Sequence, residues 1–374
     1  SMSRKQFFSF LLIFSLLFSC ASALAEADDD DDWDDNVDDA WEMEHPLHSG
    51  DYAYALLDDG TVEITSYGGA DTEIVIPDTL DGKPVTAIGE RAFYYSLSLT
   101  SVTIPDSVTH ISQKAFSCCF QLTSITLPSG LTAIESGTFD LCKSLTTIDI
   151  PDSVAAIADD AFIGCKALQS FTLSPNHPYF FLADDALCRT ADSTLLLYPN
   201  ARENRTYRIL DGIAAISAYA FYDCDLLESV VIPDSITQIP ERAFYGCSAL
   251  ASVSLPDSLT EIGIAAFSGC SALTGIRIPA AITEIINHTF SGCTSLATLE
   301  IPDSVTKIGD YAFFGCTSLT SIAIPDSVTA IGNGAFSNCT ALTLTVTPDS
   351  YAAEYAKANN IPYTYPDAND WLNN

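Results

Sequence analysis

Basic residues are scarce in this sequence. It has 15 Lys and Arg against 49 Asp and Glu, which gives a formal net charge of −34 at pH 7. Nucleic-acid phosphates and anionic lipid surfaces are bound mainly by Lys and Arg, so this composition argues against both kinds of partner. Two interpretations of the acidity stay open, since it can keep a repetitive protein soluble or attract a basic partner.

Catalytic and metal-binding motifs are also missing. The five histidines are scattered, and neither a His-Glu-x-x-His pattern nor the nucleophile elbow of hydrolases occurs. There are no Cys-x-x-Cys pairs or Cys/His clusters, which argues against the usual zinc sites. We therefore expect no enzyme activity, no cofactor and no metal. The catalytic alternative is a secreted hydrolase assisted by a cation at the repeated Pro-Asp turns.

The apolar run at residues 7–18 is too short to span a bilayer. It follows Arg4 and Lys5 and precedes Ala23-Leu24-Ala25, which is the order of regions in a secretory signal peptide. We therefore predict that residues 1–25 are a signal peptide and that the protein is secreted, extracellular or held at the cell surface. Lipid attachment at Cys20 is the alternative, and it would provide a link to the membrane.

Residues 26–50 begin with a dense run of Asp. A calcium loop needs oxygen ligands at alternating positions around a Gly turn, and residues 26–44 contain no Gly. Blocks of like charge repel one another and rarely fold. We predict an acidic, disordered linker over 26–50.

A repeat fills most of the remaining chain. Phe recurs at a constant interval from Phe93 to Phe162 and again from Phe221 to Phe336, and the unit reads Ile-Pro-Asp-Ser-Val-x-x-Ile-Gly-x-x-Ala-Phe-x-x-Cys. A period of about 23 residues, combined with a Leu-x-x-Ile-x-Ile strand, predicts a leucine-rich-repeat solenoid. We assign residues 51–349 to the solenoid, with an N-terminal cap at 51–92. Residues 350–374 form a C-terminal cap and tail, with Ser350 as the N-cap of a short helix.

Each unit contains one strand that ends at the repeated Pro. Side chains alternate along a strand, so Val102 and Ile104 should enter the core while Ser101 and Thr103 face outward on the expected concave sheet. The corresponding outward pairs are Ser101/Thr103, Ser124/Thr126, Thr147/Asp149, Ser170/Thr172, Ser229/Val231, Ser252/Ser254, Gly275/Arg277, Thr298/Glu300 and Ser321/Ala323.

Nine of the twelve cysteines lie three residues after the repeated Phe. Disulfides between neighbouring coils are possible in a secreted protein. However, disulfides join coils in pairs, whereas these cysteines recur identically in every coil and are odd in number. We predict a column of buried thiols instead.

The repeat is interrupted between Phe162 and Phe221, which are separated by more than twice the regular interval. Residues from about 174 to 206 contain two short apolar runs around a polar turn, which predicts a β-hairpin projecting from the solenoid. Aromatic and basic residues gather there, and insertions on solenoids often lie on a binding face. The alternative is a tolerated loop whose aromatic side chains pack back on the solenoid. The residues concerned are Tyr179, Phe180, Phe181, Arg189, Arg202, Arg205 and Arg208.

The repeated unit resembles that of BspA-like leucine-rich-repeat surface proteins. This resemblance implies a right-handed, mostly β solenoid of the α/β class with a parallel concave sheet. For some family members it also implies adhesion to host matrix proteins or to other cells. We therefore predict a non-enzymatic extracellular or cell-surface binding protein with a protein or glycan partner, and a structural protein of an envelope layer is the alternative. Candidate binding residues are the seven named in the interruption, together with Ser101, Thr103, Ser124, Thr126 and Arg277.

Overall fold

The computed structural model describes residues 46–366, which belong to one compact unit. The expected signal peptide, Cys20 and most of the expected linker lie outside these residues. Regular structure begins earlier than predicted, because β1 (Leu47–Ser49) pairs with β2 (Tyr52–Leu56) in an antiparallel ladder. The last residues assigned to the linker therefore belong to a strand.

Antiparallel strands precede the repeated coils. β2 pairs with β3 (Val62–Tyr67) across a tight turn in which Gly60 has a φ of 82°. β3 then pairs in parallel with β6 (Lys83–Ile88), which also forms a hairpin with β5 (Thr79–Leu80). Through β6, this first segment joins the parallel strands of the solenoid.

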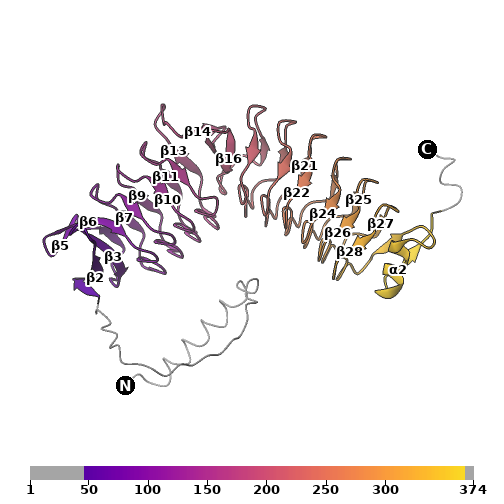
Figure 1. The fold of residues 1–374 in the computed structure, drawn as a ribbon, viewed down its shortest axis with the longest axis horizontal. Helices are drawn as coiled ribbons and strands as arrows, with labels where there is room; N and C mark the ends of the chain where they lie inside the picture. Colours follow the sequence, from indigo (N-terminus) through magenta and orange to yellow (C-terminus); the bar gives the residue numbers. More distant parts are fainter. Residues whose placement is uncertain (1–45, 367–374) are drawn as a thin grey trace, which may run out of the picture. The chain divides into compact units, whose positions relative to one another are not determined.

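One set of parallel strands runs along the coils and is here called the first ladder (Figure 1). It carries the outward-facing residue pairs. Partners such as Ser101 and Ser124 occupy the same position in consecutive coils, and the middle residue of each strand is buried. The predicted alternation is thus confirmed, with Val102 and Ile104 in the core. The strands are β4 (Glu73–Val75), β7 (Ser101–Thr103), β9 (Ser124–Thr126), β11 (Thr147–Asp149), β13 (Ser170–Thr172), β17 (Thr206–Arg208), β19 (Ser229–Val231), β21 (Ser252–Ser254), β23 (Gly275–Arg277), β25 (Thr298–Glu300), β27 (Ser321–Ala323), β29 (Thr343–Thr345) and β30 (Tyr363–Thr364).

A second ladder of short parallel strands forms in addition to the one strand per unit that the sequence predicted. Its buried member is the Ile at the Ile-Gly position of the repeat, such as Ile262, or its equivalent Ile111, which Ser112 follows. Residues 83–88 of β6 begin this ladder. The other strands are β8 (His110–Ile111), β10 (Ala133–Ile134), β12 (Ala156–Ile157), β16 (Thr194–Leu197), β18 (Ala215–Ile216), β20 (Gln238–Ile239), β22 (Glu261–Ile262), β24 (Glu284–Ile285), β26 (Lys307–Ile308) and β28 (Ala330–Ile331).

The repeated Phe side chains form a stacked column inside the coils. Phe244 and Phe267 are fully buried, and their ring centroids are 5.3 Å apart at an interplanar angle of 7°. The backbone N–H of Phe244 donates to the carbonyl of Ala266 in the next coil at 2.9 Å. Each coil is therefore bound to its neighbour by an aromatic stack and by a backbone hydrogen bond at the same position.

The repeated cysteines hydrogen-bond to this column. The Cys247 thiol donates to the Phe221 carbonyl at 2.9 Å, and the Cys293 thiol donates to the Phe267 carbonyl at 3.2 Å. All cysteines within residues 46–366 are free thiols, which confirms the predicted thiol column. Burial raises the pKa of Cys293 to about 12, so at neutral pH its thiol keeps the proton that it donates.

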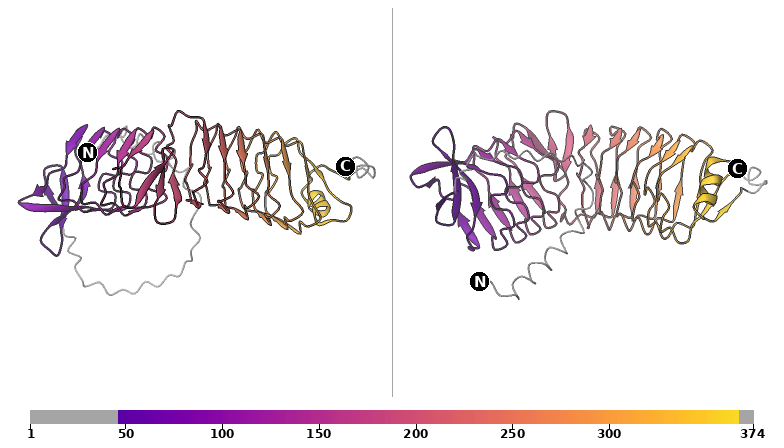
Figure 2. Two further views of the ribbon diagram at one scale, coloured as in Figure 1. Left: turned by 90° about the horizontal axis from the view of Figure 1, so that it is seen from above. Right: turned by 60° about the horizontal axis from the view of Figure 1, so that its bottom comes forward.

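The C-terminal end contains a helix, α2 (Tyr351–Ala358), that follows the last coil (Figure 2). The Ser350 hydroxyl accepts a hydrogen bond from the Ala353 N–H at 3.1 Å, so the predicted N-cap is confirmed. After the helix, β30 pairs in parallel with β29. In the described part of the chain, no helix has the length and apolar content needed to cross a membrane.

Truncation of a stacked ring should destabilise the solenoid. We expect Phe267→Ala to lower the free energy of unfolding by about 3–5 kcal/mol, because a fully buried ring leaves a cavity. Phe314→Ala is the matched control, since this half-buried Phe adjoins the column. Urea unfolding followed by circular dichroism measures both variants. Equal losses of unfolding free energy in the two variants would show that a Phe in the column contributes no more to stability than Phe314 does.

Thiol reactivity should follow burial. Cys339 is partly exposed, whereas Cys270 and Cys293 are buried. Since the thiolate is the reactive form, iodoacetamide at pH 8 should modify Cys339 first and leave the other two intact until urea unfolds the chain. Peptide mass mapping over a time course measures the order. Modification of Cys270 as fast as Cys339 in the folded protein contradicts the buried column.

Candidate functional site

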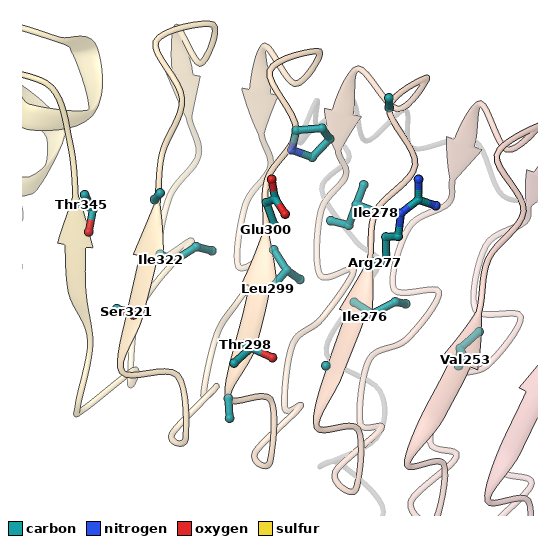
Figure 3. Close-up of a pocket in the computed structure, with 15 residues that line it drawn as sticks. Val253, Ile276, Arg277, Ile278, Thr298, Leu299, Glu300, Ser321, Ile322 and Thr345 are labelled. Atoms are coloured by element: carbon teal, nitrogen blue, oxygen red, sulfur yellow. The ribbon is translucent and has the colours of Figure 1, made fainter. Parts of the chain in front are cut away.

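The exposed face of the first ladder is hollowed between β21 and β29. The hollow has a volume of about 890 Å³, and its lining comes from five consecutive coils. Figure 3 shows the strands side by side, with Arg277 and Glu300 on neighbouring strands. Its size lies within the range of about 300–1,000 Å³ that is common for ligand pockets.

Small residues create this hollow. Gly275 stands where the neighbouring strands carry Thr298 and Ser252, and Ala323 stands where the next coil carries Thr345. A Cβ atom on Gly275 would lie 3.0 Å from the Thr298 hydroxyl oxygen, so a side chain there would occupy part of the space. Because the outward residues here are small, buried apolar residues such as Ile276 form the floor of the hollow.

Two charged residues of opposite sign lie within the hollow. Arg277 and Glu300 are register partners on β23 and β25, yet the Arg277 guanidinium pairs with Asp257 at 2.7 Å. Both members of that ion pair are mostly exposed, so it contributes little to stability. Within residues 46–366, Glu300 has no ion pair. The site thus contains a neutralised arginine and an unbalanced carboxylate.

The hydroxyl residues proposed from the sequence lie on the same face but in other coils. Ser101 and Thr103 lie on β7 and are half-buried, whereas Ser124 and Thr126 lie on β9 and are exposed. The Ser124 hydroxyl lies 3.4 Å from that of Ser101, so these side chains bond along the ladder. Of the proposed residues, Arg277 is the one that lines the hollow.

The interruption is built into the core rather than projecting from it. β14 (Phe180–Ala183) and β15 (Ala186–Arg189) form a hairpin, and β15 continues to β16, whose four residues are all buried. Phe180 is 2% exposed, Phe181 packs against the core, and Tyr179 remains 44% exposed. The predicted hairpin is present, but the expectation that it projects is wrong, because its apolar residues fill the junction between two core clusters. The alternative, in which the aromatic side chains pack back on the solenoid, holds for Phe180 and Phe181.

Tyr198 takes the place of the missing Phe in the column. Its ring is fully buried and stacks at 5.3 Å on Phe221, which lies one regular repeat further along the chain. The interval between Phe162 and Phe221 is therefore one enlarged coil that ends at Tyr198, followed by a regular one. The spacing of Phe residues does not predict this position, because Tyr occupies it.

The arginines of this segment are neutralised by neighbouring carboxylates. Arg202 is 11% exposed and pairs with Asp184 and Asp185 at 3.0 and 2.9 Å, and it also contacts the Tyr198 and Tyr207 rings. It fastens the hairpin turn to the solenoid. The other pairs are Arg189–Asp192, Arg205–Glu228 and Arg208–Asp211. These arginines do not form a free basic patch.

The described residues contain no group of three or more His, Cys, Asp or Glu side chains placed to hold a metal ion. Several of the repeated Asp residues instead bond to a neighbouring coil. Asp106 accepts hydrogen bonds from the backbone N–H and the hydroxyl of Ser129 at 2.8 and 2.9 Å, which lower its pKa. Such carboxylates cap turns between coils.

The chain is similar to several solved structures, and leucine-rich-repeat proteins are among them. A leucine rich cell surface protein from Faecalibacterium prausnitzii shares 31% identity, with 85% of this chain and 97% of that chain covered and a TM-score of 0.49. A leucine-rich repeat protein from Eubacterium ventriosum shares 24% identity over 80% and 95% of the two chains, with a TM-score of 0.62. The pneumococcal vaccine antigen PcpA shares 17% identity over 87% and 99%, also at 0.62.

No curated protein matches the chain. Residues 72–182 and 214–343, together more than half of the chain, match the BspA type leucine rich repeat region in six copies. The matched residues include the strand and the stacked Phe of each unit and the thiol of every unit except that of Phe93, where Ser96 takes its place. The chain is a member of the BspA type leucine-rich-repeat family.

Proposed function

We propose that this protein is a non-enzymatic binding protein, secreted or held at the cell surface, that recognises a partner protein through the hollow on the first ladder. The hollow is the observation that carries the proposal. Gly275, Arg277 and Glu300 depart from the hydroxyl pattern of the face and, unlike Asp149 and Val231, which also depart from it, they line the hollow. Departures from a repeat that do not improve packing are the positions at which a function can be encoded.

The shape of the hollow favours a protein partner. It extends across five coils and is open along the face, as is typical of solenoid surfaces that bind extended segments. Tyr and Trp, which dominate tight interfaces, are absent from its lining. We therefore expect affinity of a moderate level. The predicted signal peptide supports an extracellular location.

A bulky side chain in the hollow should weaken recognition of the partner. We expect Ser321→Tyr to weaken saturable binding to a panel of immobilised extracellular proteins by about tenfold or more, a loss of about 1.4 kcal/mol. Ser124→Tyr is the matched control, because Ser124 occupies the same position of the repeat on β9, outside the hollow. Surface plasmon resonance with the purified protein measures both.

The hairpin can be tested separately with Tyr179→Ala, which removes its exposed ring. Deletion of residues 174–206 is unsuitable, because it removes β16 and the buried Tyr198. We expect Tyr179→Ala to bind as the unmodified protein does. Absence of saturable binding across the panel, or equal losses for Ser321→Tyr and Ser124→Tyr, contradicts the proposal.

A further inference from the structure

The charges of the hollow do not balance. Arg277 forms an ion pair with Asp257 at 2.7 Å, although Glu300 is its register partner on the adjacent strand. Asp303, which follows in the same coil as Glu300, is exposed and forms no ion pair with any residue that the structure describes. After the Arg277–Asp257 pair is counted as neutral, this coil presents uncompensated negative charge at the hollow.

The sequence of the turn after β23 explains why Arg277 pairs with a carboxylate of another coil. Most coils place Asp after the repeated Pro, but the coil of Arg277 has Ala280 at this position. Arg277 therefore finds no carboxylate in its own turn and pairs with Asp257 of the preceding coil. The hollow is therefore bordered on one side by the neutral Arg277–Asp257 pair, and Glu300 gives it a negative charge.

The floor of the hollow is apolar. Ile276, Leu299 and Ile322 are the buried middle residues of three adjacent strands and lie beneath it. Thr298 and Ser321 supply exposed hydroxyls on successive coils. A ligand that matches this surface has an aliphatic stem, a cationic end for Glu300, and polar groups spaced along its length.

The dimensions favour a short extended peptide. Five parallel strands at a spacing of about 4.8 Å span about 19 Å, which corresponds to about six residues of extended chain. A Lys or Arg side chain combines an aliphatic stem with a charged end. The chain as a whole carries a net charge of −34, which also attracts cationic segments.

We propose that the hollow binds an extended, basic segment of a partner protein across β21 to β29, with a Lys or Arg side chain paired to Glu300. This inference rests on the proposed binding function and specifies its partner. Gly275 provides the space that the segment enters, and the Arg277–Asp257 pair forms the edge beside it. Glu300 is the residue that selects for positive charge.

Three pools of fluorescent peptides test this assignment. Each pool contains nine-residue, end-capped peptides with uncharged random flanks and a central Lys, norleucine or Glu. The purified protein should bind the Lys pool about fivefold more tightly than the norleucine pool, as expected for one exposed ion pair. It should bind the Glu pool least tightly. Fluorescence anisotropy at 0.15 M salt measures the apparent Kd.

Two variants locate the effect. Glu300→Gln should remove the preference for Lys while leaving norleucine binding unchanged, and Gly275→Tyr should weaken all three pools. Asp149→Asn is the matched control, because Asp149 is an exposed carboxylate at the equivalent position on β11, outside the hollow. It should retain the Lys preference. Circular dichroism spectra should show the same fold for every variant.

Several results would overturn the inference. They are equal binding of the Lys and norleucine pools, a Lys preference that survives Glu300→Gln, or a loss in Asp149→Asn as large as in Glu300→Gln. Failure of every pool to bind would also overturn it. Saturable binding to the protein panel that is lost in Ser321→Tyr would in that case leave the proposed function standing with another class of partner.

Discussion

The contact between the Phe ring of one coil and that of the next is the interaction on which the solenoid depends. Ring centroids are separated by 4.7 Å between Phe221 and Phe244 and by 5.6 Å between Phe290 and Phe313. The Phe N–H bonds to the following coil, and its carbonyl accepts a thiol from that coil. A single coil cannot satisfy these groups, so stability arises between neighbours.

This constraint leaves the face of the first ladder free to vary. The inward side chains must fit a column, but the outward ones face solvent and contact little. Hydroxyl residues predominate there, and β-branched Thr suits a strand. The departures at Gly275, Arg277 and Glu300 fall in consecutive coils and together produce the hollow. These substitutions in two adjacent coils therefore give one part of the face its own shape and charge.

Much of the fold could be predicted from the sequence, because the period of the repeat places the same residue types at the same position in each coil. The constant spacing of the repeat predicted the first ladder, the buried Phe column and the free thiols, and Ser350 predicted the start of α2. The second ladder was missed, since two-residue strands leave almost no pattern. The packing of Arg202 was missed because it depends on contacts with the Tyr198 and Tyr207 rings, which sequence spacing does not reveal.

The candidate site was predicted less completely. Sequence alternation placed Gly275, Arg277 and Glu300 on the outward face, but it did not show that their strands line a hollow. It singled out Arg277 for its charge and gave no weight to Glu300, because the pairing of Arg277 with Asp257 is a contact between coils. The structure is needed to show that Glu300, and not Arg277, is left without an ion pair among the described residues.

Hydrogen–deuterium exchange of the protein with and without bound partner tests the central claim most directly. If the hollow is the binding surface, protection on binding should be concentrated in peptides that contain residues 275–277, 298–300 and 321–323. Protection confined to residues 101–126 or to the hairpin at residues 179–189, with the hollow unchanged, would contradict the account.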